Sequence, residues 1–242
     1  MPRFFKENFK TEPFIDGGDF AHITRSLRMK VGEKLTVSDG LGTDFNCVIS
    51  NIGAERVEFN ILEELKSESE PDVKVTLCTC LLKGDKFEQV IKHSVELGVD
   101  KIVPVISKNC VSRPDDKALK SKTARWQKIA DEAAGQSGRG KLPQIAKAVT
   151  LKEFAEKIKD FDIALFFYEA GGEPLGETLW QYQNAENIAV ITGPEGGFET
   201  IEAELLKSKG AKVISLGKRI LRAETAPLAA LAGIMLLTDN LE

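Results

Sequence analysis

Long apolar segments are missing from this sequence of 242 residues. No uninterrupted apolar run approaches the roughly 18 residues that can span a bilayer. The first residues, Met1-Pro2-Arg3-Phe4-Phe5, are followed by Lys6 and Glu7, whereas a signal peptide would continue with an apolar segment. We therefore expect a soluble, cytoplasmic protein that does not enter a membrane.

Histidine and cysteine are also scarce. Only His22 and His93 are present, and neither has a partner at motif distance, which disfavours a metal site or a Ser-His-Asp arrangement. The cysteines form no C-x-x-C pair, so we expect reduced thiols and no bound metal. The four cysteines are Cys47, Cys78, Cys80 and Cys110.

The sequence also lacks an overall excess of positive charge. Its 33 basic and 37 acidic residues give a net charge of −4, which argues against a protein that coats nucleic acid through charge alone. The charge is unevenly distributed, because residues 108–147 contain ten basic and four acidic side chains, a local net charge of +6. This basic window indicates either an RNA-binding patch or a solvated helical face.

The N-terminal part shows the short-period alternation of apolar residues that is typical of β-strands. Apolar residues alternate across 35–37, 45–49 and 57–61, with a glycine-containing turn at 39–42. The segment 63–72 is charged and contains Pro71, as a linker would. This pattern predicts a small β-barrel in residues 1–70 and a second domain in residues 71–242.

Beyond the linker, apolar runs of strand length alternate with helical periodicity, which predicts an α/β domain with a parallel sheet. Thr150 and Glu153 have the spacing of a capping box, so a helix should begin there. The expected strands are 73–80, 101–106, 162–168, 188–192 and 213–216. The other expected helices are 87–97, 126–134, 201–206 and a final one from about residue 225.

A glycine-rich turn, Gly193-Pro194-Glu195-Gly196-Gly197-Phe198, follows the expected strand 188–192. The carboxyl end of a parallel strand is where α/β folds bind ligands. The turn lacks the Gly-Lys-Ser/Thr of a P-loop and the G-x-G-x-x-G spacing of dinucleotide folds. Taken alone, it indicates a ligand site or merely a tight structural turn.

A second motif begins at the end of the last expected strand and reads Ser215-Leu216-Gly217-Lys218-Arg219-Ile220-Leu221-Arg222-Ala223-Glu224-Thr225-Ala226-Pro227-Leu228-Ala229-Ala230-Leu231. Together with the glycine-rich turn, it resembles the two C-terminal motifs of the RsmE family, the bacterial 16S rRNA uracil-N3 methyltransferases of the SPOUT class. Further segments match in the family's order: Arg3-Phe4-Phe5, His22, 27–33, 96–98, 125–126 and 132–139. Two positions depart from the family pattern, which often has threonine at Val95 and an arginine near Asn109.

The resemblance implies an α/β fold: a SPOUT methyltransferase domain tied in a deep trefoil knot, preceded by a small PUA-like, RNA-binding β-barrel. It also implies that S-adenosyl-L-methionine is held by three loops. Backbone groups can bind the adenine and ribose there, and leucine and isoleucine side chains can form apolar walls. The expected cofactor-binding residues are Tyr168, Glu169, Gly193, Pro194, Glu195, Gly196, Gly197, Leu216, Gly217, Ile220 and Leu221.

Methyl transfer to uracil requires N3 to lose its proton, which calls for a base or for cationic stabilisation of the anion. Arg222 and Glu224 follow the cofactor segment and are candidate catalytic residues. The spacing of Glu132, Gln136 and Arg139 places them on one helical face. Glu132 and Arg139 are therefore further catalytic candidates, and the alternative is that these side chains only form hydrogen bonds at the surface.

The resemblance further implies 16S rRNA in the assembled small ribosomal subunit as the partner, with no membrane and no metal. The expected RNA-binding residues are Arg3, Arg25, Arg28, Lys117, Lys120 and Lys122. We also expect a homodimer, because the final helix is apolar and SPOUT enzymes pair through the knot region.

Two other functions stay open at this point. One is a SPOUT enzyme that methylates the ribose 2′-hydroxyl or another base, although the Asn-x-Gly-x-x-x-Arg element of the ribose branch is absent. The other is a non-catalytic RNA-binding or assembly factor that keeps the fold as a scaffold. Such a scaffold would have no reason to bind S-adenosylmethionine.

Overall fold

The computed structural model describes residues 2–241, which form two compact units. The first, here called the barrel unit, contains the chain up to Glu70 together with Ala134–Leu142. The second, the α/β unit, contains Pro71–Ala133 and Pro143 onward. The sequence placed residues 134–142 in the second domain, whereas in the structure they group with the first.

The barrel unit is a five-stranded sheet in the order β1-β3-β4-β5-β2. β1 pairs with β3 in parallel, and the other neighbours are antiparallel. A short helix, α1 (Gly17–Ala21), and a π-helical turn at His22–Ser26 follow β2. The strands are β1 (Arg3–Phe5), β2 (Phe14–Asp16), β3 (Lys34–Ser38), β4 (Thr43–Ile52) and β5 (Arg56–Lys66).

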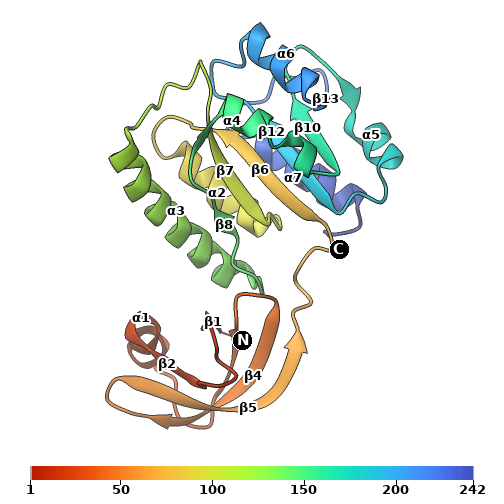
Figure 1. Cartoon of the computed structure of the whole chain (residues 1–242). Helices are drawn as coiled ribbons and strands as arrows, with labels where there is room; N and C mark the ends of the chain where they lie inside the picture. The colour runs from red at the N-terminus through yellow and green to blue at the C-terminus, as the bar shows by residue number, and fades with distance from the viewer. Residues whose placement is uncertain (1, 242) are drawn as a thin grey trace. The chain divides into compact units, whose positions relative to one another are not determined.

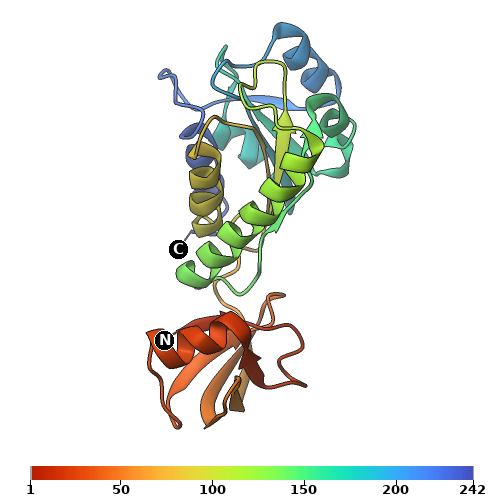
Figure 2. The same ribbon diagram turned by 90° about the vertical axis from the view of Figure 1, so that its left-hand side faces the viewer.

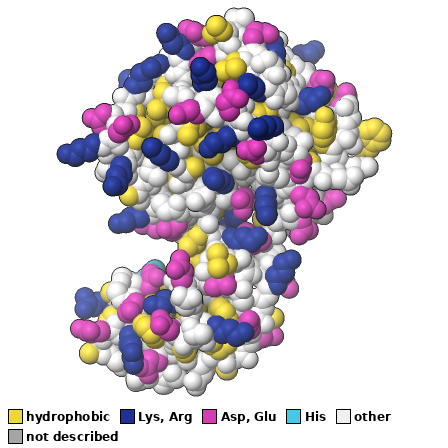
Figure 3. Space-filling model, in the orientation of Figure 1, with side chains coloured by type: hydrophobic (Ala, Val, Ile, Leu, Met, Phe, Trp, Pro, Cys, Tyr) yellow, Lys and Arg dark blue, Asp and Glu magenta, His cyan; other side chains and the backbone are white. Residues whose placement is uncertain are grey.

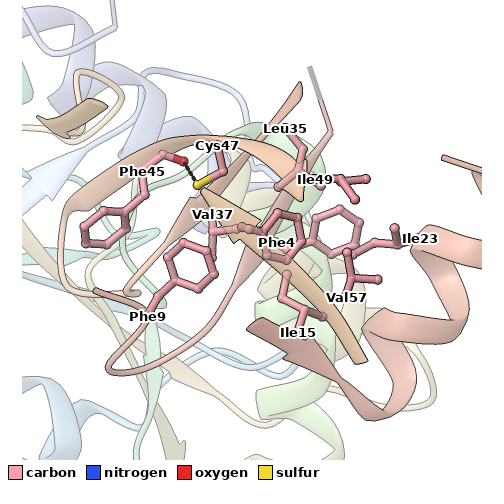
Figure 4. Packing of buried hydrophobic residues seen from close by; sticks show 11 residues of the cluster. Phe4, Phe9, Ile15, Ile23, Leu35, Val37, Phe45, Cys47, Ile49 and Val57 are labelled. Carbon is pink, nitrogen blue, oxygen red and sulfur yellow. Dashed lines mark hydrogen bonds between the residues drawn. The ribbon is translucent and has the colours of Figure 1, made fainter. Parts of the chain in front are cut away.

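Side chains on one face of these strands form the core of the barrel unit, because every second side chain of a strand points to the same face. Leu35 and Val37 of β3 are fully buried beside Val57 of β5. Figure 4 shows them packed with aromatic rings, including Phe9, around the sheet. β4 is irregular at Asn46/Cys47 and at Ile49/Asn51, and such bulges bend a strand around its core.

A buried ion pair ties residues 134–142 into the barrel unit. Arg139 donates from Nε and Nη2 to the two carboxylate oxygens of Glu70 at 2.9 and 2.8 Å, and both side chains are 5% exposed. The backbone N–H groups of Gly140 and Lys141 donate to the same carboxylate. Burial alone would raise the pKa of Glu70, but the hydrogen bonds and charge of Arg139, with these two N–H groups, lower it.

The α/β unit contains a parallel sheet in the order β11-β13-β10-β12-β6-β7-β8, with β9 also paired to β7. Its central strands are continuous apolar runs, as expected for a sheet covered on both faces. The strands are β6 (Lys74–Cys80), β7 (Lys101–Ile106), β8 (Gln144–Ile145), β9 (Val149–Thr150), β10 (Ile163–Phe167), β11 (Glu173–Pro174), β12 (Asn187–Thr192) and β13 (Lys212–Ser215).

Helices cover both faces of this sheet (Figures 1 and 2). α2 and α7 contact each other, and α7 also contacts β6 and β12, whereas α4 packs with α6 against the other face. α4 begins with the expected capping box of Thr150 and Glu153. The helices are α2 (Lys86–Glu96), α3 (Asp116–Ser137), α4 (Leu151–Ala155), a 3-10 turn (Ile158–Asp160), α5 (Leu175–Gln181), α6 (Thr200–Ser208) and α7 (Ala226–Leu237). In residues 2–241, none of these helices has the length and apolarity needed to cross a membrane.

Candidate functional site

A cavity of about 450 Å³ lies within the α/β unit, at the carboxyl ends of neighbouring strands. Three chain segments line it, and they follow β10, β12 and β13: residues 167–171, 192–197 and 214–226. Lys86, at the start of α2, completes the lining. The carboxyl ends of parallel strands meet at one edge of a sheet, so segments far apart in sequence converge there.

All eleven residues expected to bind the cofactor line this one cavity. The side chains of Leu216, Ile220 and Leu221 lie on the lining together with Arg222 and Glu224. The two C-terminal motifs found in the sequence therefore form a single pocket with the segment after Tyr168.

The turn at 193–198 needs glycine for reasons of space and backbone conformation. Gly197 has φ = +68°, a region that favours glycine, and a Cβ there would collide with a carboxylate oxygen of Glu169. A Cβ on Gly193 would come within 2.9 Å of the Phe198 ring. A side chain at Gly193 would displace the Phe198 ring or the turn itself, and one at Gly197 would strain the backbone.

Aromatic rings pack beside the glycine-rich turn. The ring of Phe166 in β10 stacks on Tyr168 with centroids 5.2 Å apart and meets Phe198 edge to face at 5.1 Å. Phe166 and Phe198 are buried, whereas Tyr168 reaches the cavity. This aromatic cluster connects the first cavity segment to the second.

Charged groups gather at one part of the cavity wall. Lys86 donates to Glu224, with Nζ 3.0 Å from Oε1 and 3.2 Å from Oε2. The backbone N–H of Glu224 itself, then the hydrogen bond from Lys86 and the charges of Lys86 and Arg222, lower the pKa of the Glu224 carboxyl. Glu224 is thus an anion that balances two cations beside the cavity.

Two side-chain contacts brace the glycine-rich turn from neighbouring loops. Glu195 accepts a hydrogen bond from the backbone N–H of Lys83 at 3.0 Å. The side-chain amide of Asn109, in the loop after β7, donates to the carbonyls of Gly196 and Gly197 at 3.2 Å each.

The other candidate catalytic residues are not part of the cavity lining. Glu132 is exposed on α3. Arg139 is buried in its ion pair with Glu70, in the barrel unit. The structure therefore brings together Arg222 and Glu224, but neither of these two.

The expected RNA-binding residues differ in their surroundings. Arg3 is paired with Asp44 through two hydrogen bonds of 2.6 and 2.9 Å, so its guanidinium is held within the barrel unit. Arg25 and Arg28 are exposed near the π-helical turn. Lys117 and Lys120 are exposed on α3, where Lys122 is half-buried with its ammonium 5.9 Å from the Trp126 ring.

Lys86 did not emerge as a candidate from the sequence, and Asn109 was noted there only as a departure from the family pattern, although each residue follows a strand. Lys86 comes shortly after β6 and Asn109 shortly after β7, at the edge where β10, β12 and β13 also end. Polar residues within a few positions of such strand ends are the signal that could have identified them. No group of three or more histidine, cysteine or acidic side chains in residues 2–241 is arranged to hold a metal ion.

Comparison with known proteins gives this architecture a class. The family model described as the RNA methyltransferase domain matches residues 68–235, and the model of the RNA methyltransferase PUA domain matches residues 15–62. A PUA domain and an α/β domain with a cavity at its strand ends thus define an RNA methyltransferase.

Relatives along the whole chain narrow this class. The ribosomal RNA small subunit methyltransferase E of Bacillus subtilis is 31% identical, and the alignment covers 100% of this chain and 98% of that protein. The protein of the same name from Synechocystis is 35% identical over 90% of this chain and 71% of its own length. The chain therefore belongs to the ribosomal RNA small subunit methyltransferase E family, which confirms the resemblance seen in the sequence.

Solved structures agree with this assignment. The ribosomal RNA small subunit methyltransferase E of Neisseria gonorrhoeae, bound to S-adenosyl methionine, superposes with a TM-score of 0.88 at 32% identity and covers 98% of both chains. A methyltransferase of Legionella pneumophila in complex with the same cofactor has a TM-score of 0.83 at 28% identity, over 97% of this chain and 96% of that one.

Proposed function

We propose that this protein methylates N3 of a specific uridine in 16S rRNA, with S-adenosyl-L-methionine as methyl donor and the assembled small ribosomal subunit as substrate. The observation that carries the proposal is the convergence of both C-terminal motifs and the segment after Tyr168 on one cavity. A non-catalytic scaffold would not need these three segments to form a pocket. Ribosomal RNA as substrate also implies that the protein works in the cytoplasm.

The cavity has properties that suit this cofactor. Its volume lies within the range of small-molecule pockets, and its lining combines backbone groups with apolar side chains. Leu216, Ile220 and Leu221 can flank the adenine, while the carboxylates of Glu169 and Glu195 can complement the positive charges of the methionine part. When bound, the cofactor supplies an electrophilic methyl group on a sulfonium.

The protein's own contribution is to position uracil N3 in line with that methyl group and to stabilise the anion left when N3 loses its proton. Arg222 is exposed on the lining, and its planar guanidinium offers five donors. We assign it to a uracil oxygen on which this negative charge develops. Lys86 adds a second positive charge to the same wall.

Glu224 has a different part in this proposal. Its lowered pKa makes it a weak base, and its carboxylate already accepts hydrogen bonds from Lys86. We therefore assign Glu224 to holding Lys86 and Arg222 in place. The contacts of Arg139 support a structural role in the barrel unit, and exposed Glu132 lies outside the cavity lining, so neither residue is assigned to the reaction.

Lysines on α3 are proposed to bind RNA phosphates, and Arg25 and Arg28 are proposed to do so separately in the barrel unit. Figure 3 shows Lys and Arg side chains along the side of the α/β unit where α3 runs, with acidic ones between them. Arg125 and Arg113 of the basic window are engaged, the first by Glu88 at 2.6 Å and the second by backbone carbonyls. Exposed Lys117 and Lys120 are thus better placed for phosphates.

Reversing Lys117, Lys120 and Lys122 to glutamate is expected to weaken RNA binding and to reduce the slope of log affinity against log salt by about two to three. Cofactor affinity should stay unchanged, because none of the three lines the cavity. Filter binding to small subunits across a salt series measures this effect. The matched control reverses exposed Lys152, Lys157 and Lys159, near α4, and an equal loss in both triple variants would contradict the assignment.

The trefoil knot and the homodimer are also part of the proposal. The knot is proposed because the chain belongs to a family whose resemblance implies the SPOUT fold. α7 presents Leu236 and Leu237, which are 57% and 51% exposed, and a second copy of the chain can cover them.

A primer-extension map of 16S rRNA tests the proposed reaction directly. Methylation at N3 blocks the Watson–Crick edge of uracil, so reverse transcriptase should stop at one uridine in RNA from cells that contain the gene and read through in cells that lack it. Restoring the gene should restore the stop. A stop pattern independent of the gene would exclude uracil-N3 methylation, and a change at a ribose would support the 2′-hydroxyl instead.

A further inference from the structure

The loop between β7 and α3, residues 107–115, makes a set of contacts that the reaction described above does not use. We infer that Asn109 is a positioning residue, which holds the carbonyls of Gly196 and Gly197 so that the glycine-rich turn keeps its cofactor-binding shape. This inference rests on the proposed function in one respect, namely that the cavity binds S-adenosylmethionine.

The geometry at Asn109 is specific. Its Nδ2 donates to two successive carbonyl oxygens of the turn, at 3.2 Å from each, across 87 and 88 residues of sequence. The fit is also close, because a Cβ on Gly196 would lie 3.0 Å from the Cβ of Asn109. Two carbonyls that point to one donor must have their peptide planes turned toward it, so this side chain constrains the backbone of the turn.

The loop that carries Asn109 is itself held rigidly. The guanidinium of Arg113 donates to the carbonyls of Ser107, Lys108 and Cys110. The Cys110 thiol lies 3.3 Å from both the backbone N and the hydroxyl of Ser107. A support with so many internal contacts can fix the position of the side chain that it presents.

A second contact joins the same loop to the helix that follows the turn. The backbone N–H of Lys108 donates to the carboxylate of Glu202 in α6 at 2.8 Å. The same carboxyl group caps α6 by accepting from the N–H of Glu199 at 3.0 Å. The loop after β7 therefore fixes both the glycine-rich turn and the beginning of the helix behind it.

The glycines explain why such an external constraint is needed. Gly193, Gly196 and Gly197 allow the turn to take many backbone conformations, and only some of them can bind a ligand. A binding-competent state that is populated only in part lowers the apparent affinity in proportion. Asn109 raises that population before the cofactor arrives.

Replacing Asn109 with aspartate tests the inference, because Asn109→Asp keeps the size of the side chain but turns the donor into an acceptor opposite two carbonyls. We expect the affinity for S-adenosylmethionine, measured by calorimetry, to fall roughly ten- to thirtyfold, which is the loss of two hydrogen bonds. Asn109→Ser, which keeps one donor, should lose less. The control is Asn60→Asp, at an exposed position of β5 in the barrel unit.

A second measurement uses the protein without cofactor. Amide hydrogen exchange of residues 193–198 should be faster in Asn109→Asp and Asn109→Ala than in the unaltered chain, while exchange in the central strands β6 and β12 stays the same. A purely structural role would instead speed exchange throughout the sheet and lower the melting temperature in parallel with affinity. That result, or affinity and exchange within twofold of the unaltered protein, would overturn the inference.

The two readouts separate this inference from the proposed function. If the unaltered protein does not bind S-adenosylmethionine, the proposed function fails. Faster exchange of the turn in the variants would still show that Asn109 constrains the glycine-rich turn. If Asn109→Asp does not fold, Asn109→Ser and Asn109→Ala give the same comparison. Normal exchange of residues 193–198 in both of these variants would then reject the inference that Asn109 constrains the turn.

Discussion

Replacing Arg222 with alanine is expected to slow methyl transfer about 10²–10³-fold while leaving the affinity for S-adenosylmethionine nearly unchanged. Arg222 is exposed on the cavity wall beside the Lys86–Glu224 pair, where it can reach a bound nucleotide. The loss follows from removing a donor aimed at charge that exists only as the reaction proceeds. Single-turnover assays on small subunits, together with calorimetry of cofactor binding, measure the two quantities separately.

Two further variants make this result specific. Arg222→Lys keeps the positive charge but not the planar fork of donors, so its rate should lie between those of alanine and arginine. Arg56→Ala, at an exposed residue of β5 outside the cavity lining, is the control. Near-normal turnover in a folded Arg222→Ala protein would remove Arg222 from the catalytic residues and leave it only as a charge partner of Glu224.

Replacing Arg139 with alanine is expected to destabilise the protein by roughly 3–5 kcal/mol, because it leaves the buried Glu70 carboxylate without its countercharge. Turnover per folded molecule should change far less than in Arg222→Ala. Denaturant unfolding measures the stability, and a single-turnover assay under stabilising conditions measures the rate. A large loss of rate with normal stability would instead support the catalytic assignment of Arg139.

The double variant Glu70→Gln, Arg139→Met removes both charges and should recover part of the lost stability, since an uncharged pair does not leave an isolated buried ion.

The dependence of stability on acidic pH provides a second test of the ion pair. The pKa of Glu70 is lower in the folded protein, so its ionised form contributes stability above the ordinary pKa near 4.5 and loses it as the pH falls through the lowered value. Glu70→Gln should therefore show a weaker decline of stability in that acid range.

Local patterns were enough to predict most elements of the α/β unit. The expected strand 101–106 coincides with β7, and the expected helix 87–97 is α2 shifted by one residue at each end. Apolar periodicity determines such elements, because one face of each must be buried. α5 at 175–181 was missed, since its sequence contains a glycine and leaves Trp180 79% exposed.

The site was predictable only where its residues are neighbours in the chain. The turn 193–198 and the segment 215–231 could be recognised as motifs because each is continuous. Lys86 and Asn109 reach the same region from the ends of β6 and β7, and the parallel sheet alone brings those ends together. Helical spacing placed Glu132 and Arg139 on one face but could not show what lies opposite that face.

The sequence by itself determined the family, the two kinds of domain and the motifs that line the cavity, because these depend on local pattern and on continuous segments. The tertiary structure determines which charged side chains are exposed and which are held in ion pairs. Arg139 pairs with Glu70, which is 69 residues away in the sequence, and Arg3 pairs with Asp44, which is 41 residues away. Both arginines are therefore held within the barrel unit. Arg222 remains exposed at the cavity. The physical reason is that the function of a charge depends on its burial and its counterion, and both arise only when distant segments pack together.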